Sequence, residues 1–517
     1  MTKAIEPKVA ATRQRAEQLQ FLRFLGDREE NKSEMAGIDH ITLLVKPTHK
    51  CNLNCEYCYD RPNRRKIGDV VMSHELVEEI VKRIPDGLPV TWIWHGGECS
   101  TIEPEWFYEA HRIISSYPNK DLVFSMQSNG YDVSNEFLKM CKDCGINIGF
   151  SFDYDTQEKR MKQDSMTQKT LDTLTRAREM LGAAGVITVI HDGNIDKMID
   201  IYEQSKDVSG SVPAFNFVFG AENASKYGVE LTNEKYQEYV EDFFYHVATD
   251  KEARATTERG FDIAFRGVMG APAAICHCSD CRYHYLCIDP VGRIHPCDRV
   301  YEDKYVYPDV RELGSVLDYF TSSQYQLWYF ITESRVVKHC KKCVYYDVCN
   351  GGCYSTHYWE NQENFENVYE RECNRTRISY DAMASVLLRI KDTEHFNYRT
   401  LKGWSNYPVV LPWELKKVVQ DLKLGGDLQH VFMTLDQYQD VCKKIGVDYA
   451  AKNLPLLKYC RILSKVEGTI RPMSMGNYYE FMKSSKEFVI RRLISAAMLG
   501  LIEIPESDVC KLREQLC

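Results

Sequence analysis

The chain has 517 residues, of which 44% are hydrophobic and 27% charged, and its formal net charge at pH 7 is −9. This length and composition are typical of a globular protein with several domains. An acidic chain without a long basic run is unsuited to binding nucleic-acid phosphates or an anionic membrane surface. No apolar stretch approaches the roughly 18 residues of a membrane span, and the first residues lack a signal core, so we expect a cytoplasmic protein.

Between residues 39 and 230, short apolar runs alternate with amphipathic stretches. The runs are rich in β-branched and aromatic side chains, which is typical of strands covered on both faces of a parallel sheet. One helix is expected after the N-cap Ser73, and another is expected to end at Gly182. The runs span residues 41–45, 90–95, 122–126, 146–152, 186–190 and 215–219. These units predict an α/β fold, a partial (β/α)6 barrel of the TIM type, with its chemistry at the C-terminal ends of the strands.

The other parts of the chain differ in composition from this region. Residues 1–38 have a polar, helical pattern and are expected to form an N-terminal arm. A helical bridge is expected over 231–275, a cysteine-rich domain over 276–378, and a mainly helical C-terminal extension over 379–517. The amphipathic pattern near the end of the extension also occurs in winged-helix peptide-recognition modules, but a capping or dimerising role is the simpler interpretation.

The chain contains 20 cysteines, which gather at 51–58, 276–297 and 340–373. Thiols stay reduced in the cytoplasm, so metal ligation explains this clustering better than disulfides do. The isolated cysteines are interpreted as small buried hydrophobic residues. They are Cys99, Cys141, Cys144, Cys442, Cys460 and Cys510.

The first group, Cys51, Cys55 and Cys58, follows the first predicted strand with the spacing C-x3-C-x2-C. Three thiolates on one short loop can bind three irons of a cubane cluster and leave the fourth iron open. A zinc site with His49 as the fourth ligand is the alternative.

This triad, with Tyr57 before its last cysteine, resembles the radical S-adenosylmethionine (SAM) superfamily. The resemblance implies a [4Fe–4S] cluster whose open iron binds the methionine part of SAM. It also implies release of a 5′-deoxyadenosyl radical that abstracts hydrogen from a substrate, and an external one-electron donor such as flavodoxin or ferredoxin.

Further motifs lie where this family has its cofactor contacts. The second predicted strand ends in His95-Gly96-Gly97-Glu98, where two glycines permit close backbone approach and Glu98 is suited to accept from the methionine ammonium group. The resemblance extends cofactor contacts to later strand ends, although Arg160 is equally interpreted as a surface ion-pair residue. The implied set is Tyr57, Gly96, Gly97, Glu98, Ser128, Asn129, Ser151, Asp153 and Arg160.

The later cysteines resemble a SPASM domain, which binds auxiliary clusters in peptide-modifying radical SAM enzymes. The resemblance implies two ligand sets, for three [4Fe–4S] clusters in all, and Gly292 is expected to make a tight turn between them. The sets are Cys281, Cys287, Cys297 and Cys353 for one cluster, and Cys340, Cys343, Cys349 and Cys373 for the other. Two zinc knuckles are the alternative; Cys276 is also spaced to replace Cys281, and the role of Cys278 stays open.

Asp298 directly follows Cys297. In the sulfatase-maturing members of the family, an acid at this place acts as a general base. A residue next to a cluster ligand is held rigidly at the wall of the active site. The alternative is an aspartate that only hydrogen-bonds the hairpin.

The resemblance implies an oxidoreductase that abstracts hydrogen from a peptide. The expected product is a thioether or carbon–carbon crosslink in a leader-bearing, ribosomally made precursor. A formylglycine-generating sulfatase maturase is the alternative, and a radical enzyme acting on a free metabolite is the third. From another class, the chain could be a metal-stapled binding module or an electron carrier.

Overall fold

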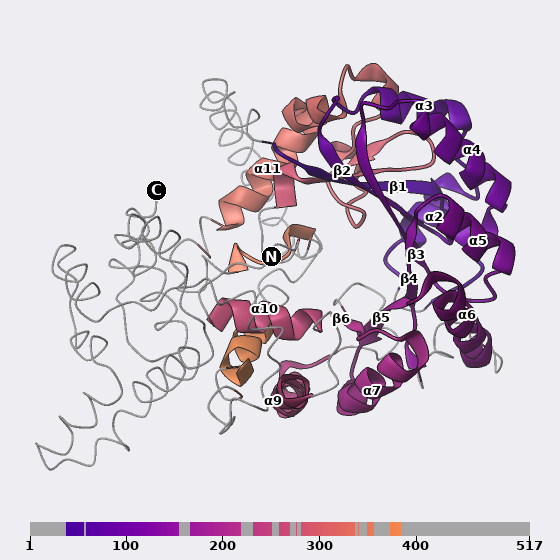
Figure 1. Ribbon diagram of the computed structural model, residues 1–517. Coiled ribbons are helices and arrows are strands. Elements are labelled where there is room, and N and C mark those ends of the chain that lie inside the picture. Colours follow the sequence, from indigo (N-terminus) through magenta and orange to yellow (C-terminus); the bar gives the residue numbers. More distant parts are fainter. Residues whose placement is uncertain are drawn as a thin grey trace, which may run out of the picture. The chain divides into compact units, whose positions relative to one another are not determined.

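We describe a computed structural model of the chain (Figure 1). It describes residues 38–55, 58–154, 166–218, 231–250, 258–268, 276, 281–336, 340, 349–355, 373–383 and 386. Tyr57, Arg160, Cys278 and Cys343 lie outside the described residues, as do nearly all of the expected N-terminal arm and C-terminal extension. Two compact units are defined: one contains residues up to 150 together with 280–335, and the other contains most of the remaining chain.

The described strands form one sheet of eight, in the order β6-β5-β4-β3-β2-β1-β7-β8. The strands are β1 (Ile41–Thr48), β2 (Pro89–Gly96), β3 (Asp121–Ser128), β4 (Asn147–Ser151), β5 (Gly185–Ile190), β6 (Ala214–Phe217), β7 (Tyr285–Ile288) and β8 (Ile294–His295). The first six coincide with the six predicted runs, so the predicted α/β fold is confirmed. Pairing is parallel except between β7 and β8.

In the first unit, helices lie along β1 to β3 (Figure 1). They are α2 (Arg61–Ile67), α3 (His74–Lys82), α4 (Pro104–Ser115) and α5 (Asn135–Asp143), and α11 (Ser323–Arg335) belongs to the same unit. Ser73 is the predicted N-cap: its side chain accepts from the backbone N–H of Leu76. The aromatic core is built from edge-to-face contacts of Trp94 with Trp106 and Phe107, which join β2 to α4.

The cysteine-rich segment supplies a strand to the barrel sheet, which was not predicted. Leu44 of β1 pairs with Cys287 of β7 in parallel register. β7 then turns back into β8 through a tight turn at Gly292, which has φ +94° as predicted for a glycine turn. Asp289 accepts from the backbone N–H groups of Val291 and Arg293 within this turn.

The second unit contains the parallel pair β5–β6 and the helices that pack with it. These helices are α6 (Met166–Leu181), α7 (Met198–Ser209), α9 (Asn233–Thr249) and α10 (Arg259–Val268). Gly182 follows α6 with φ +88°, as predicted. Glu258 accepts from the backbone N–H groups of Phe215 in β6 and Phe261 in α10, at 3.2 and 2.8 Å. None of the helices within the described ranges is long and apolar enough to cross a membrane.

Candidate active site

The cysteine triad lies on the loop that leaves the C-terminal end of β1. α2 follows this loop, and its two arginines bind the loop backbone: Arg61 donates to the carbonyl oxygen of Cys55 at 2.5 Å, and Arg64 to that of Cys51 at 3.3 Å. Burial raises the pKa of Cys51 to about 12 and that of Cys58 to about 11. These thiols therefore need a bound cation to become thiolates near neutral pH.

The spacing of the thiols fits a cluster better than a single metal ion. Ligand sulfurs around one tetrahedral zinc stand about 3.8 Å apart, because each Zn–S bond is about 2.3 Å. Among the described residues, only Asp39, His40 and His284 form a group of three or more metal-ligand side chains with all ligand atoms within 4.8 Å of one another. The three sulfurs of the triad are thus farther apart than zinc requires, as thiolates on separate irons would be.

Gly96 and Gly97 bring the end of β2 against the backbone before the triad. The N–H of Gly97 donates to the carbonyl oxygen of Thr48 at 3.0 Å, and that of Glu98 to Lys50 at 2.7 Å. A Cβ atom on Gly97 would lie 2.0 Å from the Lys50 carbonyl oxygen, and Gly96 has φ +129°. In this structure the two glycines are required for close approach to the cysteine loop itself.

Glu98 joins the ends of β2 and β3. Its buried carboxylate accepts from the Ser128 hydroxyl at 2.8 Å, from the Asn129 N–H at 2.6 Å and from the Ser100 N–H at 3.0 Å. The Asn129 side chain in turn donates to Asn52 on the cysteine loop at 2.7 Å. A carboxylate offers about four lone-pair sites, so one remains for a further donor such as an ammonium group.

A buried charged group, absent from the sequence-based prediction, ties the two ends of the cysteine loop together. Lys46 at the end of β1 donates to one oxygen of Asp60 at 2.7 Å, and His49 lies 2.8 Å from the other. All three residues are at most 5% exposed. Burial would raise the pKa of Asp60, but Lys46 and His49 hold it well below its usual value. The charged residues flanking the triad in sequence were the available signal.

Asp298 contacts the cysteine loop through Tyr59. The Tyr59 hydroxyl donates to the Asp298 carboxylate at 2.6 Å, and the Cys297 thiol to its other oxygen at 3.2 Å. Its partly buried position would raise the pKa of Asp298, but Arg299 and then Lys46 hold that pKa below the usual value. Asp298 is therefore a carboxylate near neutral pH, with its proton-accepting form directed at the loop.

His95 is a further titratable group beside this carboxylate that the sequence analysis did not assign. Its buried Nδ1 has no hydrogen-bond partner within the described part of the chain. Burial lowers the pKa of His95, although Asp298 opposes this effect, so the imidazole is neutral at physiological pH.

The other expected site residues are distributed over both units. Cys281, Cys287 and Cys297 belong to the first, and Cys340, Cys349, Cys353 and Cys373 to the second. The described cysteines form no disulfide bonds, and Cys276 is exposed. In the second unit, Ser151 ends β4 and is half-buried, and Asp153 is buried and accepts from the N–H of Val189 at 3.0 Å.

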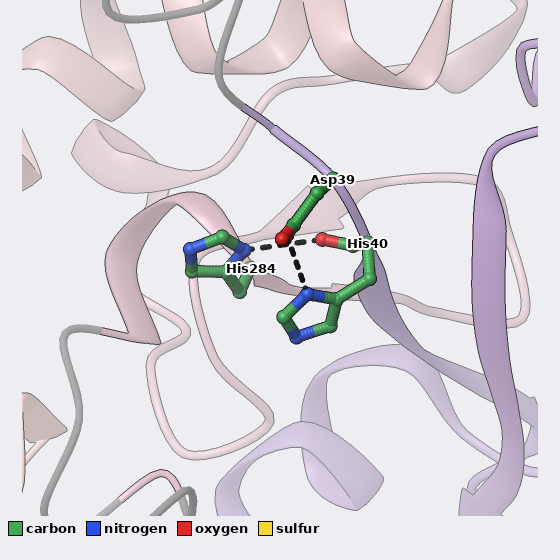
Figure 2. Close-up of side chains that lie close together, drawn as sticks. All are labelled: Asp39, His40 and His284. Carbon is green, nitrogen blue, oxygen red and sulfur yellow. Dashed lines mark hydrogen bonds and ion pairs between the residues drawn. The ribbon is translucent and has the colours of Figure 1, made fainter. Parts of the chain in front are cut away.

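Asp39, His40 and His284 form a separate group in the first unit, where β1 and β7 begin (Figure 2). His40 Nδ1 lies 2.7 Å from Asp39, and His284 Nδ1 lies 3.1 Å from the His40 carbonyl oxygen. The two rings stack with an interplanar angle of 11°. Parallel rings direct their nitrogens along parallel lines, so a shared metal would require a ring to turn away from these hydrogen bonds.

Comparisons with known proteins bear on this site. Residues 45–204 match the model of the Radical SAM superfamily. The cysteine-type anaerobic sulfatase-maturating enzyme of Clostridium perfringens (strain 13 / Type A) is 23% identical over 333 residues, or 60% of this chain and 88% of that enzyme. The serine-type enzyme of Bacteroides thetaiotaomicron is 22% identical over 361 residues, or 60% of this chain and 82% of that enzyme.

A solved structure shares the fold. Native anSMEcpe with bound AdoMet and Cp18Cys peptide has a TM-score of 0.55 and 19% identity, covering 68% of this chain and 99% of that one. The chain belongs to the radical SAM superfamily and is an enzyme of the radical SAM type. The family implies a [4Fe–4S] cluster and SAM as cofactors. This class excludes the alternatives of a binding module or a simple electron carrier.

Proposed function

We propose that this enzyme oxidises a side chain of a peptide or protein substrate, with Asp298 as the general base. The hydrogen bond between Tyr59 and Asp298 carries this proposal, because it holds an ionised carboxylate against the cysteine loop. The comparisons with sulfatase-maturating enzymes support a cysteine or serine side chain as the substrate group, which would become formylglycine. A thioether or carbon–carbon crosslink in a precursor peptide is the second candidate, favoured by the 40% of the chain that the match to the Clostridium perfringens enzyme leaves uncovered.

In this proposal Cys51, Cys55 and Cys58 bind the first cluster, and Glu98 with the β3 turn binds the methionine part of SAM. When bound, the cluster and SAM supply the hydrogen-abstracting radical, and two auxiliary clusters supply an acceptor for the second electron. The auxiliary ligands are those expected from the SPASM-like pattern, and a flavodoxin or ferredoxin supplies the first electron.

The protein's own residues handle the proton and the geometry. Oxidation of an alcohol or thiol carbon removes one hydrogen atom and one proton in addition to an electron. Asp298 accepts the proton from the substrate oxygen or sulfur, and Tyr59 orients the carboxylate for this transfer. Lys46 and Arg299 keep Asp298 ionised before the substrate binds.

The first experiment replaces Cys51, Cys55 and Cys58 together by Ala in the full chain, reconstituted anaerobically. We expect release of 5′-deoxyadenosine from SAM to stop while the auxiliary iron remains bound. Continued release would refute the assignment of the triad.

The second experiment compares Asp298→Asn with Asp303→Asn, a control aspartate that is exposed and paired with Lys66. Peptides carrying Cys or Ser are incubated with each enzyme, and products are identified by mass spectrometry. We expect Asp298→Asn to cleave SAM but to lower peptide oxidation about 100-fold or more, the scale of general-base catalysis. Equal oxidation by both variants would exclude Asp298 as the base, and a product lacking only two hydrogens and no aldehyde would favour crosslinking.

A further inference from the structure

Lys46 is a lysine at the end of β1 with only 1% of its surface exposed. Lysine is almost never fully buried without a partner, because an ammonium group loses its hydration. Burial would lower the pKa of Lys46, but the Asp60 carboxylate raises it above the usual value, so the side chain is a permanent cation.

The contacts of Lys46 reach both cysteine-bearing segments of the first unit. Its Nζ donates to Asp60, two residues after Cys58, at 2.7 Å. The same Nζ donates to the main-chain oxygen of Asp298, the residue after Cys297, at 3.2 Å.

The strand register brings a second auxiliary candidate close to this cation. β1 and β7 pair in parallel, with Leu44 opposite Cys287 and Val45 opposite Ile288. Lys46 is the next residue along β1, and it interacts electrostatically with Cys287. A single buried positive charge thus lies beside Cys287 and the residue that follows Cys297.

We propose that Lys46 raises the reduction potential of the auxiliary cluster bound through Cys287 and Cys297, while it holds the Asp298 segment against the cysteine loop. A reduced cluster carries one more negative charge than an oxidised one, so a buried cation stabilises the reduced form. Charges in a buried site are screened little by solvent or salt. The inference rests on the proposed function, because it requires the auxiliary cluster to be present.

Two substitutions test the charge with opposite signs. Lys46→Met removes the cation, and Asp60→Asn removes the anion but leaves Lys46 in place. Both are made in the full chain that also carries Ala at Cys51, Cys55 and Cys58, so only auxiliary clusters report. Midpoint potentials are measured by redox titration with electron paramagnetic resonance detection.

We expect one midpoint potential to become more negative in Lys46→Met and more positive in Asp60→Asn, and to change little in Lys46→Arg. The matched control is Lys206→Met, which breaks another buried ion pair, with Asp250 at 2.8 Å, in the second unit. It is expected to lower the melting temperature of the protein without moving either potential.

Unchanged potentials in both Lys46→Met and Asp60→Asn, or shifts of the same sign, would overturn the proposal. If Lys46→Met does not retain iron, Asp60→Asn and Lys46→Arg decide the question: a positive shift in the first with no shift in the second supports it, and any other result overturns it. Failure of the proposed function is distinguishable, because the parent chain would then release no 5′-deoxyadenosine whatever the potentials are.

Discussion

Glu98 shows how one side chain can organise a cofactor site before any cofactor binds. It accepts three hydrogen bonds from residues of two strand ends, and its burial leaves water little access to the carboxylate. The sequence analysis predicted a role for Glu98 at the cofactor from its position after Gly96 and Gly97. The hydrogen bonds to Ser128 and Asn129 could not be predicted, because they depend on how β2 and β3 end side by side.

Replacing Glu98 by Gln tests this arrangement. An amide has only one acceptor oxygen, so its NH2 group would face a backbone N–H donor, at a cost of about 1–3 kcal/mol in the free energy of unfolding. The lost charge should also weaken SAM binding by about 10- to 100-fold. Chemical denaturation and equilibrium dialysis measure the two effects. Glu103→Gln, at an exposed residue, is the control, and equal SAM affinity of both variants would contradict the assignment.

At the scale of elements, the predicted strands were reliable where the pattern was long and apolar. β1 is the clearest case, since Ile41, Leu43, Leu44 and Val45 are all almost fully buried. β7 was missed as a sheet strand because it has four residues among cysteines and its partner is distant in sequence. Lys46 and Asp60 were missed because a charged residue in a pattern normally indicates an exposed position.

The junction of β2 with the cysteine loop depends on Gly97. A methyl group there would meet the Lys50 and His49 carbonyl oxygens, which are backbone atoms and cannot move aside alone. We expect Gly97→Ala to displace the cysteine loop, to lower the iron content by roughly one cluster and to destabilise the protein by about 1–3 kcal/mol.

Iron analysis and thermal melting measure these changes. Gly185→Ala is the matched control, because a methyl group there meets no atom within 4 Å. If the two variants retained equal iron, the close approach would not matter for the cluster.

The edge of β6 depends on Glu258 in the same way. Both carboxylate oxygens are used, one by Phe215 of β6 and one by Phe261 of α10. In Glu258→Gln, one N–H donor is left facing the amide group, at a cost of about 1–3 kcal/mol. Chemical denaturation measures the loss, and hydrogen exchange should show it at Phe215. The control is Glu234→Gln, at an exposed residue in the first turn of α9, where no such loss is expected.

At the scale of the whole molecule, the iron content separates the interpretations of the cysteines. Three [4Fe–4S] clusters would give about twelve irons per chain, and Ala at Cys51, Cys55 and Cys58 should remove about four of them. Cys141→Ala, at a buried helical cysteine, should remove none. Elemental analysis with Mössbauer spectroscopy measures this, and stoichiometric zinc in place of iron would contradict all three assignments.

The pairing of β1 with β7 also constrains how the protein is made. Ribosomes add about 5–20 residues per second, so β7 emerges some 12 to 48 s after the strand that it must join, about 240 residues earlier. During that interval the outer edge of β1 offers unpaired backbone groups to any other extended chain. The cysteines at 51–58 are exposed over the same period. Correct maturation thus depends on this edge and these thiols being shielded until the nascent chain has supplied its own eighth strand pair.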